Sequence, residues 1–191
     1  MKIALVQMDV AHGKPVENKK HVKEMLERAL SEKPDVIVLP EMWNTGYALD
    51  ELDGLADKEG LDSQEILSHF ARKHAVAIIG GSVAIEKDGK FYNTTYVYNK
   101  SGDLINTYSK VHLFGLMAED QYMSAGSSES VFELDGVTAT SVICYDIRFP
   151  EWVRTQMAQG AKVLFCGSAV ARTSCATMGD LLRRVTLKSS F

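Results

Sequence analysis

The sequence is poor in cysteine and has no long uninterrupted apolar run. Its three cysteines, Cys144, Cys166 and Cys175, are too few for a disulfide framework and are in keeping with a reducing cytosol. No apolar stretch approaches the roughly 20 residues of a membrane-spanning helix. The amino terminus turns polar at Asp9, too soon for a signal peptide. These absences predict a cytoplasmic protein that has no membrane partner.

Positive charge is not concentrated anywhere along the chain. The formal net charge is −4, and no Lys/Arg run offers a surface that could follow a phosphate backbone, so nucleic acid is not expected as a partner. Internal repeats, low-complexity segments and linkers are also missing. Hydrophobic residues make up 46% and charged residues 24% of the 191 residues, which is ordinary for a globular domain and predicts one folded unit.

Apolar runs alternate with amphipathic stretches in the first half of the chain. Residues 3–8, 35–39 and 76–79 have the pattern of buried strands, and amphipathic helices are predicted at 16–30 and 63–74, the second capped by Ser63. A strand over 82–85 should continue the strand at 76–79. This order is typical of a layered α/β fold.

The second half of the chain reads as hairpins and longer loops. Asp88-Gly89 and Asp135-Gly136 are hairpin turn signals. The remaining predicted elements are a half-buried strand at 91–99, strands at 104–108, 131–134, 137–144 and 161–165, a helix at 151–159, and loops at 42–60 and 115–130. Hairpins added to the parallel units predict mixed sheets.

Cys144 stands at the end of an apolar run and directly before a dense polar cluster at 145–151. A strand that delivers a cysteine to its carboxyl end places it where α/β proteins build their sites. A cysteine in an apolar run can equally be inert packing. From this stretch alone the nucleophile and the buried thiol remain alternatives.

Glu41 and Lys110 also directly follow predicted strands. Each alone would ordinarily be a solvated surface charge. Together with Cys144 they suit acyl transfer, in which a carboxylate takes the thiol proton and an ammonium stabilises the oxyanion of a tetrahedral intermediate. His112 is the one histidine near such a strand end, and a Cys–His pair is the weaker arrangement.

Three segments carry a resemblance to a known family. Pro40–Tyr47 (PEMWNTGY), Tyr108–Phe114 (YSKVHLF) and Cys144–Glu151 (CYDIRFPE) resemble, in this order, the catalytic motifs of the nitrilase superfamily of carbon–nitrogen hydrolases, and Ile3–Met8 is similar to the family's first strand. The resemblance implies a four-layer α-β-β-α sandwich, subunits that pair into a homodimer or larger homo-oligomer, and no metal or organic cofactor.

The resemblance also implies roles for individual residues. Glu41 would be the base, Lys110 the oxyanion stabiliser and Cys144 the nucleophile. Glu119 matches a second acid of the family that helps to position the lysine or the attacking water. The backbone N–H of Tyr145 is the expected partner of Lys110 in the oxyanion site.

Two features favour an amide as the small-molecule substrate. Trp43–Tyr47 and Cys144–Glu151 most resemble the omega-amidase branch, which hydrolyses 2-oxo-acid amides such as 2-oxoglutaramate. True nitrilases usually carry Trp after the cysteine, where this chain has Tyr145. Other short amides, N-carbamoyl compounds and nitriles remain competing substrates.

Tyr47 and Arg148 are candidate substrate-binding residues. Tyr47 either lines the pocket or packs in the core. Arg148 either binds a substrate carboxylate in bidentate fashion or forms a structural ion pair with Glu151 or Asp146.

The family pattern is lost after Phe165. Residues 1–165 are expected to form an incomplete carbon–nitrogen hydrolase domain, and 166–191 an atypical ending of a truncated or frame-shifted member, with exposed sheet edges and reduced solubility. A catalytically silent homologue or assembly module is therefore the alternative to an enzyme. A redox-sensor role for Cys144 ranks third, because neither other cysteine has the spacing of a resolving partner.

Overall fold

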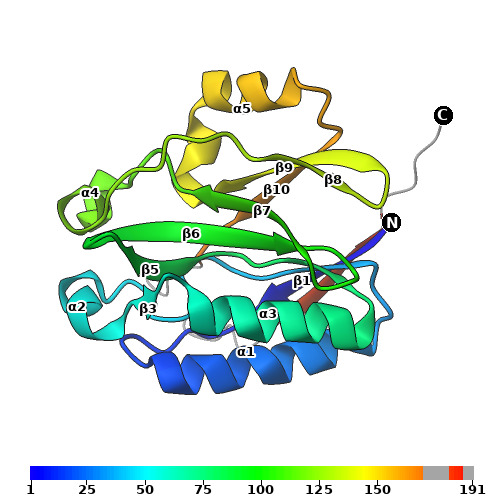
Figure 1. Ribbon diagram of the computed structural model, residues 1–191, viewed down its shortest axis with the longest axis horizontal. Coiled ribbons are helices and arrows are strands. Elements are labelled where there is room, and N and C mark those ends of the chain that lie inside the picture. Colours follow the sequence, from blue (N-terminus) through cyan, green and yellow to red (C-terminus); the bar gives the residue numbers. More distant parts are fainter. Residues whose placement is uncertain (170–180, 187–191) are drawn as a thin grey trace.

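Four layers build the molecule, two helical and two of β-sheet (Figure 1). The computed structural model describes residues 1–169 and the backbone of 181–186; of the predicted atypical ending, 170–180, which include Cys175, and 187–191 lie outside the described residues. Helices α1 (Pro15–Leu30) and α3 (Leu61–His74) cover one outer side, and α5 (Pro150–Met157) covers the other. The predicted α-β-β-α sandwich with mixed sheets is confirmed.

Among the described residues, the larger sheet has eight strands, in the order β11-β1-β2-β4-β6-β5-β3 with β7 on β6. Its central strands β1, β2 and β4 are parallel, and β6 pairs antiparallel with β4, β5 and β7. The strands are β1 Lys2–Gln7, β2 Val36–Val38, β3 Asp57–Lys58, β4 Ala77–Ile79, β5 Val83–Lys87, β6 Lys90–Tyr98, β7 Leu104–Ser109 and β11 Leu181–Thr186.

Strands β4 and β5 follow one another along the same edge of β6. Val97 of β6 pairs with Ile79 of β4 and with Asn106 of β7, and Thr94 pairs with Val83 of β5 and with β7. Since β7 occupies one edge at both positions, β4 and β5 share the other. The prediction that the strand at 82–85 continues the strand at 76–79 across Gly80-Gly81 is confirmed. The pairing register with β6 shifts by one residue between the two strands.

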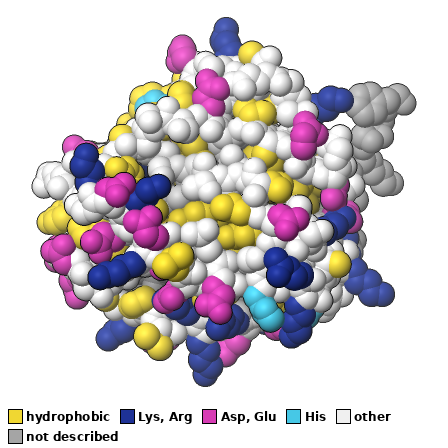
Figure 2. Space-filling view, viewed as in Figure 1, with side chains coloured by type: hydrophobic (Ala, Val, Ile, Leu, Met, Phe, Trp, Pro, Cys, Tyr) yellow, Lys and Arg dark blue, Asp and Glu magenta, His cyan; other side chains and the backbone are white. Residues whose placement is uncertain are grey.

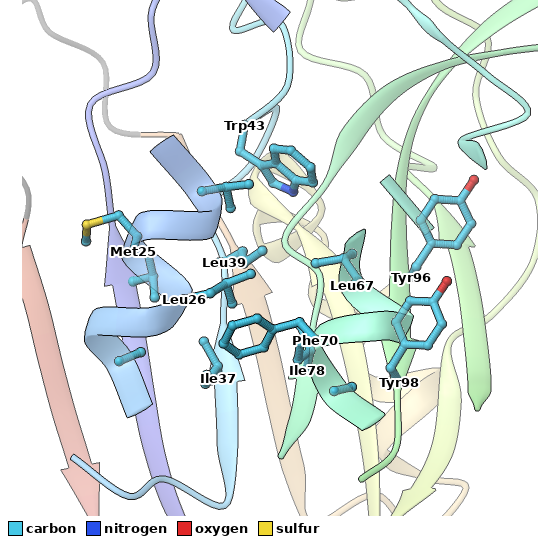
Figure 3. Close-up of a cluster of buried hydrophobic side chains, with 14 of the residues drawn as sticks. Met25, Leu26, Ile37, Leu39, Trp43, Leu67, Phe70, Ile78, Tyr96 and Tyr98 are labelled. Carbon is cyan, nitrogen blue, oxygen red and sulfur yellow. The ribbon is translucent and has the colours of Figure 1, made fainter. Parts of the chain in front are cut away.

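A core lies between the large sheet and its two helices. Met25 and Leu26 of α1 and Phe70 of α3 pack onto the side chains of β2, β4 and β6 (Figure 3). Alternate strand residues take part, because successive side chains of a strand point to opposite faces. Ile37 faces this core, while Val36 and Val38 on either side of it face the second sheet.

The smaller sheet has three described strands in the order β10-β9-β8, and it packs on the inner face of the larger one. These are β8 Val131–Leu134, β9 Val137–Ile143 and β10 Val163–Gly167. The apolar layer between the sheets joins Phe132, Leu134, Ala139 and Phe165 to strand residues of the larger sheet. Both sheets therefore share one buried interface.

The two predicted hairpin turns are confirmed. Asp88-Gly89 joins β5 to β6 and Asp135-Gly136 joins β8 to β9, with both residues of each pair at positive φ, as this turn type requires.

Several local expectations differ from the structure. Helix α3 begins at Leu61, ahead of Ser63, because the Asp57 carboxylate accepts the backbone N–H groups of Asp62 and Ser63 and caps the helix from outside. β6 is buried on both faces from Asn93 onward, since helices cover one side and the second sheet the other.

The predicted loops and the last helix need similar adjustment. The loops contain short helices: η1 Leu49–Glu51, α2 Leu52–Leu55, η2 Gly115–Met117 and α4 Glu119–Tyr122. The last helix begins at Pro150, a residue favoured in a first turn because it has no N–H to leave unpaired, and ends two residues before the predicted end.

Charges of both signs are interspersed on the face shown in Figure 2, around a centre where hydrophobic side chains lie among uncharged side-chain or backbone atoms. Among the described residues, no helix is long and apolar enough to cross a membrane.

Candidate active site

A buried ammonium lies between two buried carboxylates at the end of β7. Lys110 Nζ donates to Glu41 Oε1 at 2.9 Å and to Glu119 Oε2 at 2.8 Å, and all three side chains are fully enclosed. Burial acts to lower the pKa of Lys110, but the two carboxylates outweigh it and hold that pKa above its ordinary value. The ammonium therefore stays charged.

Asn93 on β6 completes this cluster. Its Nδ2 donates to Glu41 Oε1 at 3.1 Å and to Glu119 Oε1 at 2.9 Å, and its backbone oxygen accepts the Lys110 N–H at 2.9 Å. Phe114 N–H donates to Glu119 Oε2 at 2.8 Å. Both carboxylates are thus held by several donors, as buried charges require.

Glu41 is positioned by the break between β4 and β5. The Pro40 carbonyl accepts the backbone N–H of Ser82 at 3.0 Å, and the Ser82 hydroxyl accepts the N–H of Met42 at 3.1 Å. Gly81 has a φ of +62°, and a Cβ there would lie 2.0 Å from the Pro40 oxygen. Only glycine allows this approach, so the Gly80–Ser82 segment sets the place of the carboxylate.

Cys144 begins the short helix η3 (Cys144–Arg148) directly after β9, with a φ of +44°. A side chain at such a sharp strand-to-helix turn projects out of the sheet, which suits a nucleophile. Positive φ is uncommon outside glycine, so the surrounding contacts must hold the turn. Sulfur also accepts a hydrogen bond from the Ser168 hydroxyl at 3.5 Å.

The thiol is held in its protonated form. Burial is the main cause that raises the pKa of Cys144, to about 11; the charge of Glu41 and hydrogen bonding with it act in the same direction, while the Ser168 hydroxyl and Lys110 oppose them. A protonated thiol beside a carboxylate is arranged for proton transfer to that carboxylate.

Asp146 joins the turn at Cys144 to the segment that carries Lys110. Its Oδ2 accepts the Tyr108 hydroxyl at 2.7 Å and the Ile143 N–H at 3.1 Å; its Oδ1 accepts the His112 N–H at 2.9 Å and lies 2.8 Å from His112 Nδ1. His112 is thus bonded to this carboxylate, in agreement with the weak case for a Cys–His pair.

The segment after β10 contributes two contacts that the sequence did not predict. Ser168 reaches the thiol, and the Ala169 N–H donates to Glu41 Oε2 at 3.0 Å. Cys166 is close as well, with its sulfur 4.0 Å from the Cys144 carbonyl oxygen. None of the three belongs to a recognisable motif, but parallel pairing of β10 with β9 brings them there.

The sequence model of the family described as carbon–nitrogen hydrolase matches residues 2–185, nearly the whole chain. The chain belongs to the carbon–nitrogen hydrolase family. The match passes residue 165, while the division of the chain at that residue remains a prediction.

Similar proteins include hydrolases of amides. The chain is 50% identical over 163 residues to the 2-oxoglutaramate amidase of Bacillus subtilis, covering 85% of this chain and 62% of that protein. The chain therefore spans less than two thirds of that relative's length.

Two solved structures extend the comparison. Saccharomyces cerevisiae Nit3 superposes with a TM-score of 0.82 at 28% identity, covering 91% of this chain and 66% of Nit3. An amidase of Nesterenkonia sp. AN1 superposes with a TM-score of 0.80 at 25% identity, covering 91% and 69%. That structure is of a mutant of the amidase, in which acrylamide is joined to the active-site cysteine by Michael addition.

The remaining predicted site residues of this family member differ in their placement. Tyr47 is half-buried and packs against an apolar cluster. Burial, followed by the charges of Glu41 and Glu119, raises the pKa of its hydroxyl. Tyr47 therefore both packs in the core and lies beside the carboxylates. Tyr145 lies in the first turn of η3, whose leading N–H groups have no acceptor within the helix.

Arg148 is exposed, and among the described residues it forms no ion pair with Asp146 or Glu151. The structural ion pair expected as one alternative is therefore not observed. The described residues also contain no group of three or more His, Cys, Asp or Glu placed to hold a metal ion.

Proposed function

We propose that this chain hydrolyses carbon–nitrogen amide bonds through Cys144. The observation that carries the proposal is the enclosed Glu41–Lys110–Glu119 cluster beside a thiol that interacts with Glu41. This arrangement supports the proposal, because amide hydrolysis through a thiol needs a proton acceptor, a positive charge and a nucleophile close together.

The reaction follows from these positions. Glu41 takes the proton of the Cys144 thiol as sulfur attacks the amide carbon, and the oxyanion is stabilised by Lys110 Nζ and the N–H of Tyr145. Glu41 returns the proton to the nitrogen, ammonia leaves and a thioester remains. Water then attacks the thioester and gives its proton to Glu41. The acid leaves, and the proton returns to sulfur.

The proposed substrates are 2-oxo-acid amides such as 2-oxoglutaramate. Support comes from the 50% identity to a 2-oxoglutaramate amidase and from the amide-type sequence around Tyr145. Arg148 is a candidate for binding the substrate carboxylate, and Tyr47 for lining the pocket. We further propose a homo-oligomer in the cytoplasm, where reducing conditions keep the thiol free.

Ammonia release from a panel of short amides, 2-oxoglutaramate among them, tests the proposal. We expect Cys144→Ala to abolish release, because no other group at this position can form the thioester. Cys166→Ala is the matched control, since it removes a neighbouring thiol and should leave most of the activity. Both variants should melt within a few degrees of the parent chain in a thermal scan.

Two outcomes would contradict the proposal. Equal ammonia release by Cys144→Ala and the parent would exclude sulfur as nucleophile. A well-folded parent that releases no ammonia from any amide would favour the silent homologue or assembly module.

A further inference from the structure

Asn93 contacts every charged member of the cluster around Lys110. Its side-chain amide bridges Glu41 and Glu119, and its backbone oxygen accepts the Lys110 N–H. Asn93 is fully buried. None of the three motifs contains it, and β6 brings it to the site only through its pairing with β5 and β7.

The orientation of the amide is determined by its surroundings. Nδ2 faces two carboxylate oxygens, whereas a reversed amide would direct its own oxygen at them. With this orientation, Asn93 Oδ1 is buried and has no hydrogen-bond partner among the described residues. A buried oxygen without a hydrogen-bond partner lowers the stability of the folded state, so the hydrogen bonds of Asn93 Nδ2 to the two carboxylates have to compensate for this loss.

The cluster has an excess of negative charge. Two carboxylates share one ammonium, and both also reach the same Asn93 nitrogen, within 3.1 Å. Like charges this close repel each other, so hydrogen-bond donors are needed to hold the two carboxylates together. The titratable groups that face the two carboxylates are Lys110, Tyr47 and Cys144. Of these only Lys110 brings positive charge.

We propose that Asn93 is a positioning residue, which holds the carboxylates of Glu41 and Glu119 in place on Lys110. This inference rests on the proposed amidase function. The neutral amide donates two hydrogen bonds without adding charge, so Glu41 stays available as proton acceptor for Cys144.

Asn93→Asp and Asn93→Ser test this role, with Thr95→Val as the matched control. Aspartate keeps the shape but adds a third carboxylate, and serine retains one donor that reaches one glutamate only. Thr95 lies two residues along β6, is equally buried, and its hydroxyl also has no partner among the described residues. The pH dependence of kcat/KM for ammonia release and the alkylation rate of Cys144, followed on its labelled peptide, are measured for each variant.

We expect kcat to fall about 10- to 100-fold in both Asn93 variants, the effect of losing a hydrogen bond to a charged group, with little change in KM. In Asn93→Asp the acid limb of the profile should move to higher pH because a third carboxylate is added, and Cys144 alkylation at pH 8.5 should slow. Thr95→Val should match the parent chain in both measurements.

If Asn93 acts in folding alone, its variants should have a lower melting temperature. Their kcat per folded molecule, the acid limb of their pH profile and the alkylation rate of Cys144 should then be unchanged. This result would overturn the inference. If Asn93→Asp does not fold, the kcat of Asn93→Ser tests the inference, and an unchanged kcat per folded molecule would overturn it. If the parent releases no ammonia, the proposed function fails, and slower alkylation of Asn93→Asp would still support the role of Asn93.

Discussion

At the scale of single residues, Glu41 has two opposed effects on Cys144. Its negative charge adds to burial in raising the pKa of the thiol to about 11, so little thiolate exists at neutral pH. The same carboxylate is the group that can remove the proton during attack. The site therefore depends on proton transfer at the moment of reaction and not on a stored thiolate.

Glu41→Gln should separate these effects. Loss of the charge lowers the Cys144 pKa toward its ordinary value, and each unit of decrease gives about ten times more thiolate at a fixed pH below that pKa. We therefore expect faster alkylation of Cys144 by iodoacetamide at pH 8.5. Ammonia release should fall by about 100-fold or more, because the base is lost.

Glu65→Gln is the control for this experiment, since it removes an exposed charge on α3 and should alter neither rate. Slower alkylation in Glu41→Gln would show that the carboxylate activates the resting thiol instead of restraining it.

At the scale of secondary-structure elements, one carboxylate sets how two strand ends meet. Asp146 binds groups two residues before and two residues after Lys110, as well as the residue preceding Cys144. Trp152 on α5 extends the network by donating to the Tyr108 hydroxyl at 3.1 Å. The end of β7, the turn after β9 and helix α5 are thereby fixed relative to one another.

Replacing Asp146 by asparagine should loosen this junction. Asparagine has one acceptor oxygen in place of two, so donors now shared between Oδ1 and Oδ2 lose their partner. We expect the free energy of unfolding to fall by about 2–4 kcal/mol in urea titrations.

Trp152→Phe removes the outermost hydrogen bond and reduces the edge contact of the ring with His112, and should cost about 1 kcal/mol. Equal losses in the two variants would mean that Asp146 is not the centre of the network.

At the scale of the whole molecule, the two sheets share one apolar interface. Phe132 and Phe165 of the smaller sheet pack on strands of the larger one. Trp43 is buried in the core between the larger sheet and its helices, and Trp152 lies on α5, the helix that covers the smaller sheet. The two tryptophans, the only ones in the chain, therefore report on different layers.

Trp43→Phe and Trp152→Phe each leave one fluorescent reporter. In a urea titration, the tryptophan fluorescence and the circular dichroism of each variant should change at the same midpoint, because one shared core makes unfolding cooperative. Adding Phe132→Ala to either variant should lower the free energy of unfolding measured by its remaining tryptophan by about 3 kcal/mol. Separate midpoints for the two layers would show that the sheets unfold independently.

Much of this structure was predictable from local patterns. Helix α1 follows from the spacing of Val22, Met25, Leu26 and Ala29, and the hairpin turns follow from Asp-Gly pairs whose positive φ few other residues accept. The start of α3 was not predictable, because its cap comes from Asp57, which lies outside the helix.

The residue order alone specified the family, the layered fold and the three residues at strand ends, because strand patterns and short motifs are encoded in consecutive positions. Only the folded chain brought Asn93, Ser168 and Ala169 to the same site. These contacts join residues up to 128 positions apart, through the register of paired strands. No local pattern encodes them, because that register is decided by the packing of the two sheets and not by any single segment.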